Sequence, residues 1–141
     1  MSGSALHADD RAYKWLTISA AVYVAGLVLH TADHIRRGTH VLTGPVLGLG
    51  FISTIIGLVI VGLILVRHPR APGLAAVFGP VTAIGVAAVH VPPRWGVFSD
   101  AFIGSTGTGV TAFSWAVVFL EIVGALALGI SGIAALKAVP E

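Results

Sequence analysis

Residues 46–66 read VLGLGFISTIIGLVIVGLILV, and this stretch decides the fold class. It contains no charged side chain, and its polar side chains, Ser53 and Thr54, can hydrogen-bond to the preceding turn of their own helix. A helix that crosses a bilayer needs about 20 consecutive, mostly apolar residues. We therefore predict that residues 46–66 form a membrane-spanning helix.

Other apolar stretches of similar length lie on both sides of this one. The segment 74–91 is the least regular, because it is rich in Ala and Gly and contains Pro80, which removes a helical hydrogen bond and should kink the helix. Such a composition suits a helix that faces protein. The sequence thus predicts an all-α integral membrane protein, a four-transmembrane-helix bundle, whose remaining spans are 15–32, 74–91 and 112–136.

The composition agrees with a membrane protein and excludes several function classes. Of 141 residues, 56% are hydrophobic and 10% are charged, which is far from the composition of a soluble domain. The net charge of +2 comes from scattered residues without a basic stripe, so we expect no nucleic-acid partner. The absence of cysteine excludes thiol catalysis and iron–sulfur clusters, so any bound metal must have nitrogen or oxygen ligands.

The charged residues outside the spans predict the orientation. We expect one domain, 13–137, between a flexible N-terminal tail, 1–12, and a C-terminal tail, 138–141. An even number of spans puts both tails and the 67–70 loop on one side, and that side carries more Lys and Arg than the other. By the positive-inside rule, we expect both termini to be cytoplasmic and the protein to lie in the plasma (inner) membrane. The expected partners are the lipid bilayer and either other membrane subunits or further copies of the chain. The residues compared are Arg11, Lys14, Arg67, Arg70 and Lys137 on the terminal side, and Arg36, Arg37 and Arg94 on the other.

Two helical faces carry small and polar side chains, whereas their opposite faces are aliphatic. A polar group at membrane depth is costly, so these faces should point into the bundle and meet there. On the first span the face consists of Ser19, Tyr23, Gly26, His30 and Asp33; on the fourth span it consists of Ser114, Glu121, Gly124 and Ala125.

The ends of the first and third spans carry the residues best suited to bind a metal ion. The rise of about 1.5 Å per residue places His30, Asp33, His34 and His90 at the same membrane face. Imidazoles at this spacing can bind zinc or copper, and His40 in the following loop could supply a further ligand. Our main hypothesis is therefore a metal site, for copper or zinc, at the extracytoplasmic end.

Glu121 is the one acid within the fourth span, and its depth separates it from this site. By the same rise it lies near mid-membrane, level with Tyr23, and too deep to share a ligand shell with His30. It could carry protons or bind a cation, or it could be a protonated acid that hydrogen-bonds Tyr23 or Ser114.

Several other functions remain open from the sequence. A single haem b could be held by His30 or His34 opposite His90. Histidines near span ends also fit a purely structural role among headgroups. Alternative functions are an accessory or scaffold subunit without chemistry of its own, and a small proton-coupled transporter that uses Glu121. No pattern for a metalloprotease, a di-iron enzyme or a serine hydrolase is present, so catalysis is not the favoured interpretation.

Overall fold

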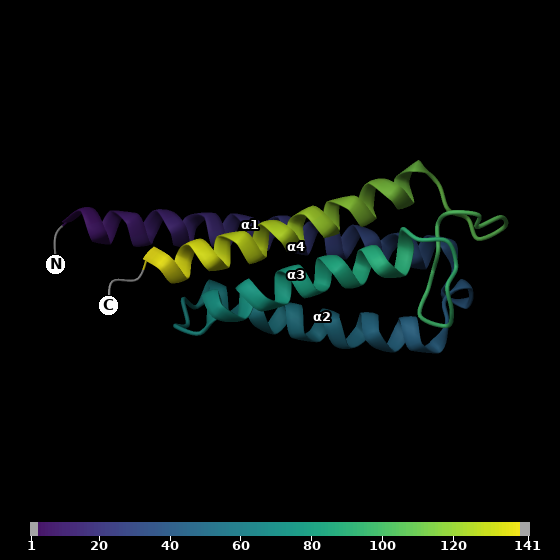
Figure 1. Ribbon diagram of the computed structural model, residues 1–141, viewed down its shortest axis with the longest axis horizontal. Coiled ribbons are helices and arrows are strands. Elements are labelled where there is room, and N and C mark those ends of the chain that lie inside the picture. The colour runs from purple at the N-terminus through teal and green to yellow at the C-terminus, as the bar shows by residue number, and fades with distance from the viewer. Residues whose placement is uncertain (1–2, 139–141) are drawn as a thin grey trace.

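The computed structural model describes residues 3–138, and they form long helices that run side by side (Figure 1). Each long helix is long and apolar enough to cross a membrane. The predicted all-α four-helix bundle of a multi-pass membrane protein is thereby confirmed for this part of the chain. The elements are α1 (Gly3–Arg37), a short 3-10 helix η1 (Thr39–Val41), α2 (Gly44–Leu65), α3 (Ala71–His90) and α4 (Ala112–Ala138).

The first helix is longer at both ends than the sequence indicates. It begins at Gly3, within the expected tail 1–12, and it continues to Arg37, past the expected end of the span at residue 32. The charges near its end do not stop the helix, because Asp33 and Arg37 are buried and paired with other charged groups. At the C-terminus α4 ends at Ala138, and residues 139–141 of the expected tail lie outside the described residues.

Helix α4 lies at the centre of the bundle, with α1 and α3 both packed along it (Figure 1). Glycines make this close approach possible. A Cβ atom on Gly26 of α1 would lie 2.6 Å from Cα of Glu121, and one on Gly129 of α4 would lie 2.6 Å from Cδ of Pro80 in α3. The helix continues through Pro80, whose ring fits against Gly129.

The two polar faces predicted on the first and fourth spans do meet. Every member of both is buried, and Ser19 hydrogen-bonds Ser131 across the α1–α4 interface at 2.8 Å. In contrast, α2 lies at the edge of the bundle beside α3, and most of its large apolar side chains are exposed. An exposed apolar surface of this kind is what a helix in contact with lipid requires.

The two ends of the bundle differ. The start of α1, the end of α4 and the α2–α3 turn lie at one end, and the α1–α2 and α3–α4 connections lie at the other (Figure 1). The α3–α4 connection, residues 91–111, is the longest and contains glycines with positive φ at 104, 107 and 109. Glycine adopts this backbone conformation without the steric cost that other residues meet. The connection can therefore fold back over the ends of α1 and α3.

Candidate metal centre

Three histidines meet at the connection end of the bundle. His30 and His34 lie one turn apart on α1, and His90 is the last residue of α3. One ring nitrogen from each of these side chains lies within 4.8 Å of the others. We call this group the histidine triad. His30 and His90 are buried and His34 is half-buried, so the triad lies inside the protein rather than on its surface.

The Nδ1 atom of His30 pairs with Oε2 of Glu121 on α4. Both side chains are buried, with 8% and 5% of their surfaces exposed. The expectation that Glu121 lies too deep to reach His30 is therefore wrong. The error arose from the end of α1: the helix continues to Arg37, so His30 lies two turns inside its end and one turn from Gly26, which packs on Glu121.

This pairing leaves the second nitrogen of the His30 ring available. Its Nε2 atom is buried and has no hydrogen-bond partner within residues 3–138. A carboxylate on one imidazole nitrogen fixes the ring orientation and makes the other nitrogen a better metal ligand. Glu121 is thus a positioning group for His30. It forms no hydrogen bond to Tyr23 or Ser114 in the described part of the chain, contrary to one of the expected roles.

The ring of His90 is oriented by the α3–α4 connection. Its Nδ1 lies 3.1 Å from the backbone oxygen of Asp100, and two backbone hydrogen bonds, from Asp100 N to Val89 O and from Phe102 N to His90 O, hold that segment against the end of α3. A carbonyl oxygen can only accept a hydrogen bond, so Nδ1 of His90 carries the proton. The lone pair then belongs to Nε2, the arrangement that a metal ligand requires.

His34 is the least constrained member of the triad. Its Nδ1 is buried and makes no hydrogen bond to any described residue, although Oδ2 of Asp100 lies 3.7 Å away. Its ring centre is 4.5 Å from that of His30 and 5.5 Å from that of His90. The ring can therefore rotate without breaking a hydrogen bond at Nδ1.

A buried ion pair closes the triad on the side of the connection. Arg37 donates two hydrogen bonds of 2.7 Å to the Asp100 carboxylate, and a third to the backbone oxygen of Thr108. Its guanidinium also lies 5.0 Å from the centre of the Phe102 ring, which packs against His90. These contacts fix the position of Asp100 beside both His34 and His90.

The other residues expected at this site lie around the triad. Asp33 is fully buried and accepts hydrogen bonds from Arg36 through Oδ1, while its Oδ2 has no partner among the described residues. His40 is exposed on η1, with its ring over Gly38. Neither is among the residues whose ligand atoms lie within 4.8 Å of one another.

From the sequence, Arg36 and Arg37 are only charges that report orientation, but in the structure both side chains join α1 to the α3–α4 connection. Arg36 also donates to Gly109 O and Ser114 Oγ, and Arg37 is buried against Asp100. The residues that sequence reasoning missed as site components are Asp100, Phe102 and Arg37. A weak signal for Asp100 existed, because it lies in the loop on the same membrane face as the triad.

The geometry is compatible with a small metal ion. Nitrogens bound to a tetrahedral ion at about 2.0–2.1 Å lie roughly 3.4 Å from one another. The triad nitrogens, within 4.8 Å of one another, would therefore have to move together by about an ångström. The His34 ring, whose Nδ1 makes no hydrogen bond to a described residue, is free to supply part of this movement. The chain matches no protein-family model, no curated protein and no solved structure.

Proposed function

We propose that this membrane protein binds one zinc or copper ion through the histidine triad. The observation that carries the proposal is the convergence of three buried or half-buried imidazoles, two of which have Nδ1 occupied by a hydrogen-bond partner. That hydrogen bonding leaves Nε2 of His30 and of His90 as the nitrogen that can bind a metal ion. Zinc and copper both accept imidazole nitrogen, and three ligands leave one position open for water or a substrate.

A bare ion fits better than the haem b alternative. With metal–nitrogen distances of about 2.0 Å, two imidazoles on opposite faces of a haem have ring centres roughly 6 Å apart. The ring centres of His30 and His90 are 4.8 Å apart, and the two planes meet at 74°. The ring centres of His34 and His90 are 5.5 Å apart, so neither pair of rings has the separation that a flat macrocycle between them requires.

Glu121 belongs to the same site in this proposal. Glu121 pairs with His30, so it is not the isolated acid on which the transporter alternative was built. We therefore assign Glu121 the role of orienting a metal ligand. This assignment leaves the scaffold function as the alternative that the experiment must exclude.

The test is metal analysis of the protein purified in detergent without chelators. We expect one zinc or copper per chain by elemental analysis and no Soret band in the absorption spectrum. His30→Ala and His90→Ala should each abolish stoichiometric binding. His40→Ala is the matched control, because His40 is exposed at the same end of the bundle, and it should retain the ion.

A protein that folds but binds neither metal, even after dialysis against Zn²⁺ or Cu²⁺, would contradict the proposal and favour the scaffold function. Equal loss of metal from the His40 and His90 variants would also contradict it. Circular dichroism of every variant distinguishes loss of ligand from loss of fold.

We also propose that the triad end faces the extracytoplasmic side of the plasma membrane. This rests on the excess of Lys and Arg at the terminal end of the bundle. Because the chain has no cysteine, Thr39→Cys and Lys137→Cys give clean single labelling sites. An impermeant maleimide added to intact cells should label the first and spare the second, and the reverse pattern would overturn the orientation.

A further inference from the structure

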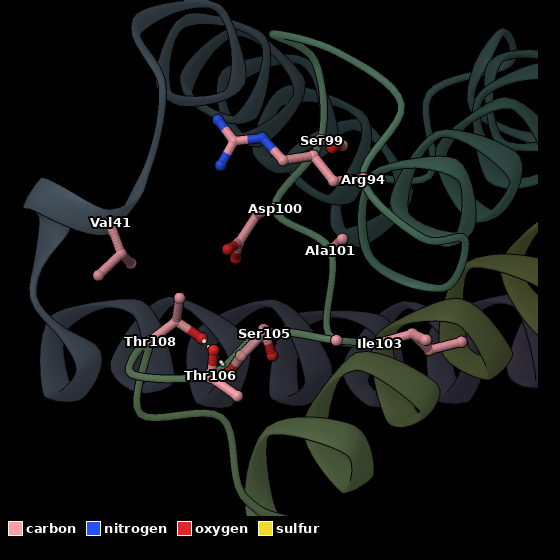
Figure 2. A pocket seen from close by; sticks show the side chains of 10 residues that line it. Val41, Arg94, Ser99, Asp100, Ala101, Ile103, Ser105, Thr106 and Thr108 are labelled. Carbon is pink, nitrogen blue, oxygen red and sulfur yellow. Dashed lines mark hydrogen bonds between the residues drawn. The ribbon is translucent and has the colours of Figure 1, made fainter.

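A cavity of about 170 Å³ lies in the α3–α4 connection, at the connection end of the bundle. A cavity of this size has room for several water molecules, and therefore for a group of about five heavy atoms such as phosphate. Figure 2 shows Arg94 on one side of the cavity, Thr106 and Thr108 on the opposite side, and the Asp100 carboxylate between them. The polar side chains that line the cavity are Arg94, Ser99, Asp100, Ser105, Thr106 and Thr108.

The unbalanced charge of this cavity is positive. Asp100 is the one acid in the lining, and Arg37 donates a hydrogen bond of 2.7 Å to each of its oxygens, so its charge is already neutralised. Arg94 is exposed, and its side chain forms no ion pair or hydrogen bond with the rest of the described chain. The other arginines at this end, Arg36 and Arg37, both pair with an acid. The ligand that complements the cavity is therefore an anion.

The lining also supplies the hydrogen-bond donors that an anion needs. Thr106 is exposed, and no described residue accepts the proton of its hydroxyl, whereas the other lining hydroxyls donate within the connection. In residues 103–109, the backbone N–H of Thr106 bonds to Gly104 O, and the remaining backbone N–H groups bond to no described acceptor. Phosphate oxygens only accept hydrogen bonds. A guanidinium, a hydroxyl and free backbone N–H groups are therefore the partners that suit them.

Large apolar side chains next to the cavity are exposed. Trp95 directly follows Arg94 in the chain and stacks on Phe98, Ile103 is part of the lining, and each of the three is 43–54% exposed. The Nε1 atom of Trp95 donates to Ala88 O at 2.8 Å, so its ring lies beside the last turn of α3. Tryptophan at the end of a span lies at the depth of the lipid headgroups. A cationic cavity beside an apolar surface at this depth matches a phospholipid, because a soluble anion would leave the apolar surface uncovered.

We propose that this cavity binds the phosphate group of an anionic phospholipid from the leaflet at this end of the bundle, with Arg94 as the main contact and the acyl chains along the neighbouring apolar side chains. A zwitterionic lipid is the weaker match. Its ammonium group balances the phosphate and needs an acid, whereas both oxygens of Asp100 are held by Arg37. Basic side chains near the membrane surface attract anionic lipids. This lipid site needs no metal ion in the triad.

The experiment uses Trp95 as a reporter, because it is the neighbour of Arg94. Trp15→Phe together with Trp115→Phe leaves Trp95 as the one tryptophan in the chain. This reporter protein is reconstituted in bilayers that mix phosphatidylcholine with phosphatidylglycerol, in which one of the two lipids carries brominated acyl chains that quench tryptophan fluorescence on contact. The quenching gives the affinity of the site beside Trp95 for phosphatidylglycerol relative to phosphatidylcholine. We expect a preference of about fivefold, the effect of one arginine near the membrane surface.

Two pairs of variants test whether the cavity is the source of this preference. Arg94→Gln should abolish the preference, and Arg70→Gln should retain it, because Arg70 is an exposed arginine at the opposite end of the bundle. Thr106→Glu places an acid without a partner in the lining and should also abolish the preference. Thr39→Glu is its control, at an exposed position outside the cavity. Circular dichroism of each variant checks that it folds.

An undiminished preference in folded Arg94→Gln would overturn the site. Equal losses in Arg94→Gln and Arg70→Gln would also overturn it, because they would show attraction by the overall charge of the protein. Inorganic phosphate, compared with chloride at equal ionic strength, tests the occupant. If phosphate alone removes the preference, the cavity takes the free anion and the lipid assignment is wrong. All measurements are made with a metal chelator present, so their outcome is independent of the proposed metal site.

Discussion

The tight α1–α4 contact at Gly26 predicts a large effect from a single methyl group. A Cβ atom there would lie 2.6 Å from Cα and 2.7 Å from the backbone nitrogen of Glu121. These are backbone atoms, so they cannot move aside unless α4 itself moves. Gly26→Ala must therefore separate the two helices next to the His30–Glu121 pair.

The magnitude follows from comparison with a glycine that has free space. At Gly62 in α2 a Cβ would meet no other atom within 4 Å. Both substitutions gain the same helical preference of alanine, about 0.5–1 kcal/mol. Only Gly26→Ala suffers overpacking, which costs about 1–3 kcal/mol. Gly26→Ala should therefore have a lower unfolding free energy than Gly62→Ala, by the overpacking cost of about 1–3 kcal/mol.

The assay is reversible unfolding of the detergent-solubilised protein with increasing SDS, followed by the helical circular dichroism signal. Zn²⁺ affinity should also fall by about tenfold in Gly26→Ala, because the Glu121 carboxylate that positions the His30 ring moves away from it. Equal stability of Gly26→Ala and Gly62→Ala would refute the close packing of α1 on α4. Lower stability without any change in affinity would refute the role of that packing in the site.

Three further outcomes are expected. Glu121→Gln keeps the side-chain shape and should weaken Zn²⁺ binding about 10–100-fold without changing the stoichiometry, as measured by competition with a chelator; an unchanged affinity would remove Glu121 from the site. Arg37→Gln leaves the Asp100 carboxylate buried without its partner and should lower the unfolding free energy by about 3–5 kcal/mol in the SDS titration. Arg67 is the control, because its pair with Asp10 is exposed. Substitution of Arg67 should change the unfolding free energy by less than about 1 kcal/mol. Acidification should weaken Zn²⁺ binding, because protons compete for the same imidazole nitrogens, and an affinity independent of pH would argue against histidine ligands.

The fold and one part of the site could be predicted from the sequence because they depend on local patterns. Residues 46–66 and the other apolar stretches have the length that a bilayer imposes, and steps of three and four residues put Ser19, Tyr23 and His30 on one face. The same depth argument placed His30, His34 and His90 at one end of the bundle. Each of these inferences needs only the helical repeat.

The remaining part of the site depends on contacts that no local pattern encodes. The His30–Glu121 pair joins α1 to α4, and its register is set where Gly26 meets the backbone of Glu121. The Arg37–Asp100 pair depends on how the α3–α4 connection folds back over the bundle. The predicted first span ends at residue 32, but pairing of Asp33 and Arg37 with other charged groups allows the helix to continue to Arg37.

The central position of α4 has a consequence for biosynthesis. Since α4 is the last of the long helices to leave the ribosome, α1 enters the bilayer with its polar face lacking the surface that later covers it. Until then His30 and Asp33 must be shielded by water, lipid headgroups or an insertion factor. A nascent chain that stops before residue 112 would keep that face uncovered and become a substrate for membrane quality-control proteolysis.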